Sequence, residues 1–304
     1  MSETQPLLSE ADELDSLLRE LESETEIREI AGWESGFPSL SRSLNGILPG
    51  LHLIIAPPSC GKTTLAKQLC DQIAEHNHIP VVFFSFAEGK RQLRVRTLAR
   101  LSGLENRAIL RGSSFLLHWY GAPKSQIEEP ERLPPSWERL KQATEKARNW
   151  LDLIYLFECN EKTDLQEITE QIGRVKQIRR STRLLVVIDD SQRLGFSQLP
   201  FDDRLPIIAG RLQGTAVDLQ APVIATWPDT KKKASPFEWA ERVPGAEVVL
   251  FMENDPERTR KLTEPNRAIN LHVVKNRGGE KETLAFDFFP ASSKFTETLP
   301  NSVL

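Results

Sequence analysis

The residues best suited to chemistry lie at positions 56–64, directly after an apolar run at 51–55. Their order, Ala-Pro-Pro-Ser-Cys-Gly-Lys-Thr-Thr, follows the pattern G-x-x-x-x-G-K-[ST], with alanine in place of the first glycine. A strand, this loop and a following helix would place backbone N–H groups and a helix N-terminus around phosphate oxygens. Lys62 can reach the outer phosphates, and the Thr63 hydroxyl can ligate Mg²⁺. We therefore expect ATP and Mg²⁺ to bind here, at Pro58, Ser59, Cys60, Gly61, Lys62, Thr63 and Thr64.

A carboxylate ends the fully apolar run at 184–188. A carboxylate at the C-terminal end of a buried strand can join the Mg²⁺ shell beside a phosphate loop. Asp189 directly follows this run, so we predict that Thr63 and Asp189 hold the metal ion. The alternative is a helix cap or turn residue.

A second acidic residue follows the apolar run at 81–86. Hydrolysis of ATP needs a group that orients or deprotonates water near the γ-phosphate. Glu88, just past the end of this predicted strand, is the candidate for that catalytic role. The alternative is a solvated turn glutamate.

The segments that must position these residues alternate between strand and helix patterns. Such alternation predicts an α/β fold with a mostly parallel sheet flanked by helices. Proline-rich residues 115–135 predict an irregular insertion, and Gly278-Gly279 predicts the turn of a C-terminal β-hairpin. The predicted strands are 51–55, 81–86, 154–157, 184–188, 223–226, 247–252, 270–275 and 282–289, and the predicted helices are 62–75, 92–102, 136–150, 164–179 and 206–219.

The amino-acid composition is that of a globular protein without a membrane-spanning segment. The 304 residues are 39% hydrophobic and 27% charged, with a net charge of −4, which is ordinary for a globular protein. Nucleic-acid binding would therefore need a local basic patch. No apolar run is long enough to cross a bilayer, and the first residues are acidic and polar. With three scattered cysteines, the sequence predicts a cytoplasmic protein with no membrane partner.

Further short motifs flank the phosphate loop and the two acidic residues. They are 35–40 (Ser-Gly-Phe-Pro-Ser-Leu), 45–50 (Asn-Gly-Ile-Leu-Pro-Gly), 84–93 (Phe-Ser-Phe-Ala-Glu-Gly-Lys-Arg-Gln-Leu), 111–112 (Arg-Gly), 188–192 (Ile-Asp-Asp-Ser-Gln), 221–225 (Ala-Pro-Val-Ile-Ala), 246–251 (Ala-Glu-Val-Val-Leu-Phe) and 275–279 (Lys-Asn-Arg-Gly-Gly). In this order they resemble the C-terminal ATPase domain of DnaB-type replicative helicases, in the RecA/KaiC group. The resemblance covers about residues 33–296.

This resemblance implies a RecA-like P-loop NTPase fold and a homo-oligomer, a hexameric ring with ATP between subunits. In that family, a lysine and an arginine of a terminal hairpin reach the γ-phosphate of the neighbouring subunit. Lys275 and Arg277 match this K-x-R pattern, so the resemblance implies a catalytic role for both in trans. A cation supplied by a neighbour would stabilise transition-state charge. Two solvated hairpin cations are the alternative.

Three positions depart from the family pattern. The family glutamate falls on Ala87, one residue before Glu88, although RecA-type recombinases also have Ala-Glu there. Trp227-Pro228 replaces the family's sensor Ser-Gln, and Ala56 replaces the first loop glycine. The sequence therefore predicts nucleotide binding more directly than hydrolysis.

The two ends of the chain suggest a domain division, and a lysine run within the core suggests a DNA contact. We expect an acidic tail at 1–32 with a short amphipathic helix that docks on its own core or on a neighbouring subunit, an ATPase domain at 33–296 and a tail at 297–304. We expect no N-terminal primase-interacting domain of the kind found in full-length family members. Lysines can follow phosphates along single-stranded DNA. The candidates are Lys231, Lys232 and Lys233, for which a solvated charge run is the alternative.

The leading interpretation is an ATP-binding, ATP-hydrolysing helicase-type ring protein acting on single-stranded DNA, with replication or recombination proteins as possible partners. Two alternatives stay open. One is a nucleotide-gated oligomeric switch without unwinding activity, which the altered catalytic and sensor positions favour. The other is a recombinase or recombination mediator, which the Ala87-Glu88 pair favours.

Overall fold

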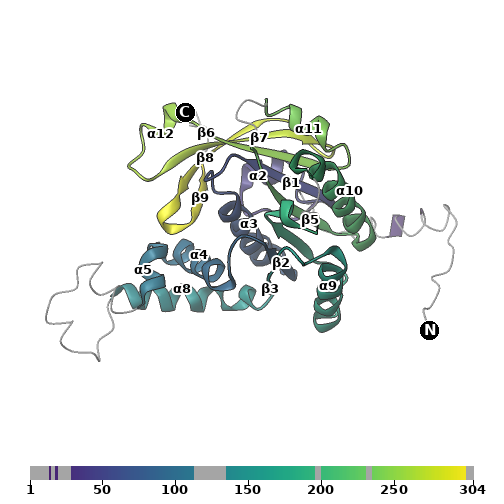
Figure 1. Ribbon diagram of the computed structural model, residues 1–304. Coiled ribbons are helices and arrows are strands. Elements are labelled where there is room, and N and C mark those ends of the chain that lie inside the picture. Colours follow the sequence, from purple (N-terminus) through teal and green to yellow (C-terminus); the bar gives the residue numbers. More distant parts are fainter. Residues whose placement is uncertain are drawn as a thin grey trace.

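The described part of the chain is built around one twisted sheet (Figure 1). The computed structural model describes residues 14, 18–19, 29–112, 135–195, 200–230 and 235–298. Within these residues the strand order is β3-β2-β4-β5-β1-β6-β7-β8-β9. The strands β3, β2, β4, β5, β1 and β6 run parallel to one another, and β7, β8 and β9 continue the sheet with antiparallel pairing. The strands are β1 (Gly50–Ala56), β2 (Val81–Ser85), β3 (Ile154–Glu158), β4 (Leu185–Asp189), β5 (Pro222–Pro228), β6 (Val248–Asn254), β7 (Arg267–Asn276), β8 (Thr283–Phe289) and β9 (Lys294–Glu297).

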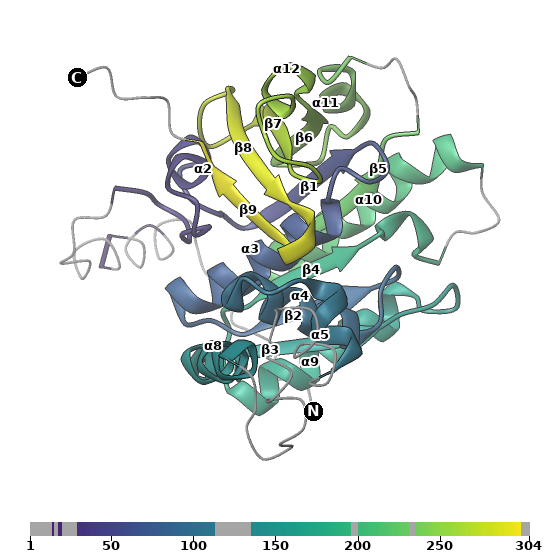
Figure 2. The ribbon, with the colours of Figure 1, turned by 90° about the vertical axis from the view of Figure 1, so that its left-hand side faces the viewer.

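Helices cover both faces of this sheet, as the two views show (Figures 1 and 2). They are α2 (Pro38–Ser43), α3 (Lys62–Asn77), α4 (Lys90–Ser102), α5 (Asn106–Arg111), α8 (Pro135–Leu151), α9 (Leu165–Arg179), α10 (Phe201–Leu219), α11 (Glu238–Arg242) and α12 (Pro256–Thr259), with short 3-10 turns η1 (Ser191–Arg193) and η2 (Pro290–Ser292). In the described residues no helix is long and apolar enough to span a bilayer.

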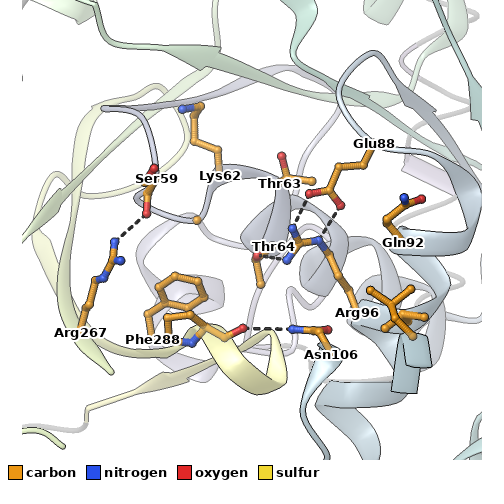
Figure 3. A pocket seen from close by; sticks show the side chains of 14 residues that line it. Ser59, Lys62, Thr63, Thr64, Glu88, Gln92, Arg96, Asn106, Arg267 and Phe288 are labelled. Carbon is orange, nitrogen blue, oxygen red and sulfur yellow. Dashed lines mark hydrogen bonds and ion pairs between the residues drawn. The ribbon is translucent and has the colours of Figure 1, made fainter. Parts of the chain in front are cut away.

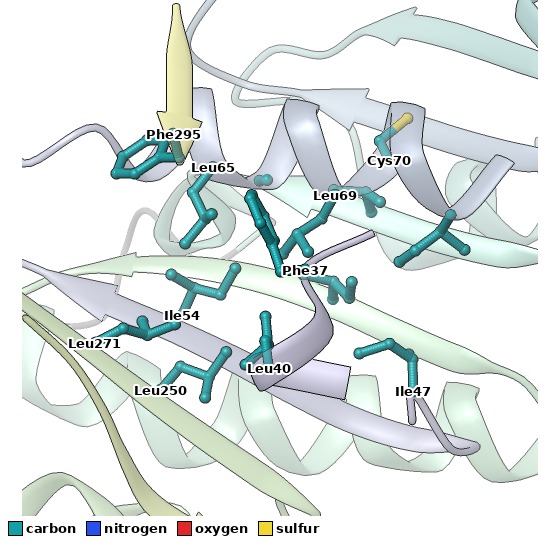
Figure 4. Packing of buried hydrophobic residues seen from close by; sticks show 14 of the residues in the cluster. Phe37, Leu40, Ile47, Ile54, Leu65, Leu69, Cys70, Leu250, Leu271 and Phe295 are labelled. Carbon is teal, nitrogen blue, oxygen red and sulfur yellow. The ribbon is translucent and has the colours of Figure 1, made fainter. Parts of the chain in front are cut away.

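Two hydrophobic clusters fill the space between helices and sheet. Successive side chains of a strand point to opposite faces. Ile54 of β1 therefore packs in the cluster beneath α3, with Leu65 and Leu69 (Figure 4), whereas Ile55 packs in the cluster beneath α9 and α10. Burial on both faces explains why the parallel strands are continuous apolar runs rather than alternating ones.

The predicted α/β fold with a mostly parallel sheet flanked by helices and a C-terminal β-hairpin is confirmed. Some predicted boundaries were wrong. Helix α10 begins at Phe201, so Pro206 lies inside the helix and not at its start. Strand β5 continues to Pro228, which places Trp227 in the strand with 1% of its surface exposed. Strand β9 and helix α2 were not predicted; the Glu297 carboxylate of β9 accepts hydrogen bonds from the first backbone N–H groups of α2.

Strand β1 contains a buried histidine, His52, whose protonation affects folding stability. His52 exposes 2% of its surface, and its Nε2–H donates to the Leu48 carbonyl over 2.7 Å. Its Nδ1 is buried and makes no hydrogen bond. Burial, which disfavours the charged imidazolium, lowers the pKa of His52 from 6.5 to about 4.

Folding stability is therefore expected to fall as the pH drops from about 6.5 toward 4. Between these pH values His52 is protonated in the unfolded chain and neutral in the folded chain. This difference lowers the free energy of unfolding by about 3 kcal/mol over the full range. Urea unfolding at a series of pH values measures this loss. His52→Gln, which keeps an N–H donor, should flatten the pH dependence, and an unchanged slope would contradict the assignment.

Candidate functional site

The phosphate loop joins the end of β1 to the start of α3. Gly61 precedes the helix with φ at +91°, in the left-handed region that favours glycine. A Cβ on Gly61 would lie 2.9 Å from the Phe295 ring and 3.0 Å from the Phe288 ring. Both the backbone conformation and the close approach of the two rings therefore require glycine at this position.

Lys62 is the first residue of α3, and its side chain folds back over the loop. Its Nζ donates to the carbonyl oxygens of Ala56 and Pro57 over 3.0 and 3.4 Å. Burial lowers the pKa of Lys62, while nearby acidic groups oppose that shift. The ammonium group thus lies against the loop. A phosphate anion there would be a stronger acceptor for it than the two carbonyl oxygens.

Thr63 and Asp189 lie 126 positions apart in the chain and are in contact. The Thr63 hydroxyl donates to Asp189 Oδ2 over 2.9 Å, and the Thr226 hydroxyl donates to Oδ1 over 2.8 Å. Asp189 exposes 1% of its surface, and burial raises its pKa to about 6, against the opposing effect of both hydroxyl donors. A divalent cation would compensate this buried carboxylate. The donor set fits Mg²⁺, which takes one or two carboxylates and fills its shell with phosphate oxygens and water. No group of three or more His, Cys, Asp or Glu side chains suited to a metal occurs among the residues placed by the structure.

Glu88 faces the same region from the loop between β2 and α4. Its backbone N–H donates to Ser85 Oγ over 3.0 Å, which fixes the loop. Both carboxylate oxygens accept from Arg96 of α4, Oε2 from Nε over 2.7 Å and Oε1 from Nη2. Arg96 Nη1 also donates to Thr64 Oγ1 over 2.9 Å. Glu88 is therefore linked to the phosphate loop through Arg96.

Lys62, Thr63, Thr64, Glu88 and Arg96 line one cavity of about 450 Å³ (Figure 3). Four of the lining residues were not predicted from the sequence: Arg96, Asn106, Arg267 and Phe288. The sequence did hold one indication of Arg96. Gln92 and Arg96 are one turn apart on one face of a helix that starts beside Glu88, so both side chains can lie near Glu88. The cavity is lined by Ser59, Gly61, Lys62, Thr63, Thr64, Glu88, Gln92, Val95, Arg96, Asn106, Leu110, Arg267, Phe288 and Pro290.

Two loop residues predicted to bind nucleotide do not line this cavity. Pro58 is exposed outside it. Cys60 exposes 1% of its surface, and its side chain packs in the core cluster of α3. Burial raises the pKa of the Cys60 thiol, which disfavours the reactive thiolate.

Lys275 and Arg277 lie at the opposite edge of the sheet from the phosphate loop. Lys275 Nζ donates to the Val243 and Pro244 carbonyls over 3.1 and 2.7 Å, and Arg277 Nη2 donates to the Pro244 carbonyl over 2.9 Å. The Arg277 backbone N–H bonds to Glu247, beside the start of β1. The five residues of β1 from there to the loop span about 17 Å. Within one chain these two cations are therefore not brought to the cavity.

The lysine run 231–233 lies outside the described residues, and so do most of the acidic N-terminal segment and the insertion. Leu14 and Leu18, which the structure does describe, are helical and expose 53% and 49% of their surface. Trp227, at the position where the resemblance implies a sensor residue, packs in the core beneath α9 and α10 and does not line the cavity.

Comparisons with known proteins find replicative DNA helicases with similar sequences. A replicative DNA helicase DnaB from Leifsonia xyli subsp. xyli is 23% identical over 290 residues, covering 89% of this chain and 57% of that protein. A probable plasmid replicative DNA helicase from Chlamydia muridarum is 27% identical over 260 residues, covering 80% of this chain and 50% of that protein. The chain thus spans about half the length of the curated relatives it matches.

Solved structures show the same fold. A structure of a DnaB-like replicative helicase, described together with its interactions with primase, superposes with a TM-score of 0.73 at 20% identity, covering 95% of this chain and 68% of that one. The family model of the DnaB-like helicase C-terminal domain matches residues 32–228, which is more than half of the sequence. This chain therefore belongs to the family of DnaB-like helicase C-terminal domains.

Proposed function

We propose that the chain is an ATP-hydrolysing, ring-forming helicase protein that acts on single-stranded DNA. The observation that carries this proposal is the convergence of Lys62, Thr63 and Glu88 on one cavity, with Asp189 bonded to the Thr63 hydroxyl. Phosphoryl transfer requires little covalent chemistry from the protein and depends on positioning and on compensation of charge. The cavity supplies a cradle of N–H groups, a cation and a carboxylate for those tasks.

Each of these groups has one task in the proposed reaction. Lys62 turns from the loop carbonyls to the phosphates and neutralises charge there. Thr63 and Asp189 would hold Mg²⁺, which would supply further charge compensation when bound. Glu88 accepts a hydrogen bond from the attacking water and orients it toward the γ-phosphate.

We further propose that Lys275 and Arg277 act on the nucleotide of a neighbouring subunit. Carbonyl groups of residues 243 and 244 hold both side chains at one edge of the sheet. About 17 Å along β1 separates this edge from the phosphate loop of the same chain. A head-to-tail ring apposes opposite edges of adjacent subunits, so the cations of one copy would meet the cavity of the next. Hydrolysis would then depend on assembly.

Mixing two inactive variants tests this role in trans. Arg277→Ala subunits supply an intact loop, and Lys62→Ala subunits supply an intact arginine. In mixed assemblies some interfaces hold both intact groups, so ATP hydrolysis is expected to recover partly above the sum of the separate variants. The measurement is ATP turnover across mixing ratios. Absence of recovery, in assemblies shown by native mass spectrometry to be mixed, would count against the trans role.

DNA binding is proposed to involve the lysine run 231–233. Neutralised phosphates release counterions, so affinity for labelled oligothymidine should weaken with salt. Replacing all three lysines by alanine should flatten the salt slope by roughly 0.7 per lost phosphate contact and leave ATP binding without DNA unchanged. An unchanged slope would leave the lysines as a solvated run.

A nucleotide-gated switch without unwinding activity is the second candidate. The observation that favours it is Trp227, which is buried in β5 where the family has a sensor side chain. ATP hydrolysis stimulated by single-stranded DNA, together with displacement of an annealed strand, supports the helicase proposal. Nucleotide-dependent assembly without strand displacement supports the switch.

A further inference from the structure

Arg96 lines the cavity, and Figure 3 shows it bonded to Glu88 and to Thr64. Its guanidinium donates to both oxygens of Glu88, to Thr64 Oγ1 over 2.9 Å and to Ser293 Oγ over 3.1 Å. These partners come from the β2–α4 loop, from helix α3 and from the turn between β8 and β9. Three separate elements therefore fix one side chain.

Ser293, which accepts a hydrogen bond from Arg96, is itself fixed by Asn106. Ser293 Oγ accepts from Asn106 Nδ2 over 2.8 Å and donates to Asn106 Oδ1 over 3.1 Å. Asn106 Nδ2 also donates to the carbonyls of Pro290 and Ala291 over 3.1 and 2.8 Å. The turn that holds Arg96 is thus tied to the start of α5, so the guanidinium has little freedom to move.

We propose that Arg96 is a positioning residue that holds the Glu88 carboxylate in the geometry needed to orient water. The inference rests on the proposed function of Glu88. A carboxylate has about four acceptor sites, and the two donors of Arg96 leave the others open to water. Fixing the carboxylate in advance removes the entropic cost of ordering it during reaction. The planar fork of arginine fits both oxygens, whereas a lysine ammonium is a point charge.

The test is a double-mutant cycle between Arg96 and Glu88 in the full chain. Arg96→Lys keeps the positive charge and loses the fork. We expect kcat for ATP hydrolysis to fall on the order of 10²-fold, as for a misplaced reacting group, with KM for ATP nearly unchanged. In the Glu88→Gln background the same change should alter kcat by less than about twofold, because a positioning residue has nothing left to position.

Arg94→Lys is the matched control, since Arg94 lies two residues away on the exposed side of the same helix. It should change neither kcat nor KM. Thermal unfolding and binding of a fluorescent ATP analogue establish that each variant is folded and loaded. A structural role alone would lower stability or ATP affinity and would not give a loss of kcat that depends on Glu88.

Three results would overturn the inference: an unchanged kcat for Arg96→Lys, a loss that is additive with Glu88→Gln, or faster hydrolysis. Faster hydrolysis would mean that Arg96 sequesters Glu88. Failure of the proposed function has a different signature. In that case the unsubstituted chain does not hydrolyse ATP, or Glu88→Gln hydrolyses it at the normal rate.

Discussion

ATP binding and turnover are expected to be lost when Lys62 is replaced by alanine. The Lys62 ammonium belongs to the phosphate-loop motif, and it donates to carbonyl oxygens of that loop. Removing a cation that compensates transferring phosphoryl charge costs about 10²–10³-fold in rate. Equilibrium binding of a fluorescent ATP analogue and steady-state release of phosphate measure both effects.

The fold should survive this change, because Lys62 belongs to neither of the two large hydrophobic clusters. The matched control is Lys141→Ala on the exposed surface of α8, which should leave binding and turnover as they are. Retained ATP affinity and rate in a folded Lys62→Ala protein would refute the assignment of the phosphate site.

Glu88→Gln should keep ATP binding and slow hydrolysis by roughly 10²–10⁴-fold, the usual contribution of a positioned acid–base group. Glutamine has nearly the same shape, but it cannot take up a proton and presents a single acceptor oxygen to Arg96. Single-turnover hydrolysis with ATP in complex with excess protein separates the chemical step from binding and product release.

An exposed pair of the same type provides the control for this variant. Glu145 and Arg148 form an ion pair on α8 with 73% of each side chain exposed. Exposed pairs of this kind contribute little, so Glu145→Gln should leave hydrolysis unchanged. If Glu88→Gln hydrolyses ATP at the normal rate, another residue orients the water.

The site shows which inferences a sequence supports. The phosphate loop was predictable because its parts are consecutive residues and its geometry is local: a strand, a left-handed glycine and a helix start. The Thr63–Asp189 contact was predictable across 126 residues because parallel buried strands end at the same edge of a sheet. The role of Glu88 stays a prediction, although the structure places it at the cavity.

Other features depended on the tertiary structure, because they follow from strand order and register rather than from neighbouring residues. The contact of Arg96 with Thr64 needs the direction of α4 relative to α3, which periodicity does not specify. Trp227 is buried because β5 pairs between β4 and β1 and extends to Pro228.

The position of Arg277 depends on the topology in the same way. The sequence determined by itself that Lys275 and Arg277 belong to a hairpin. Only the antiparallel pairing of β7 with β6 decided that they lie at the edge far from their own phosphate loop. Pairing between strands distant in the chain is set by packing of the whole sheet, so local propensity carries no information about that distance.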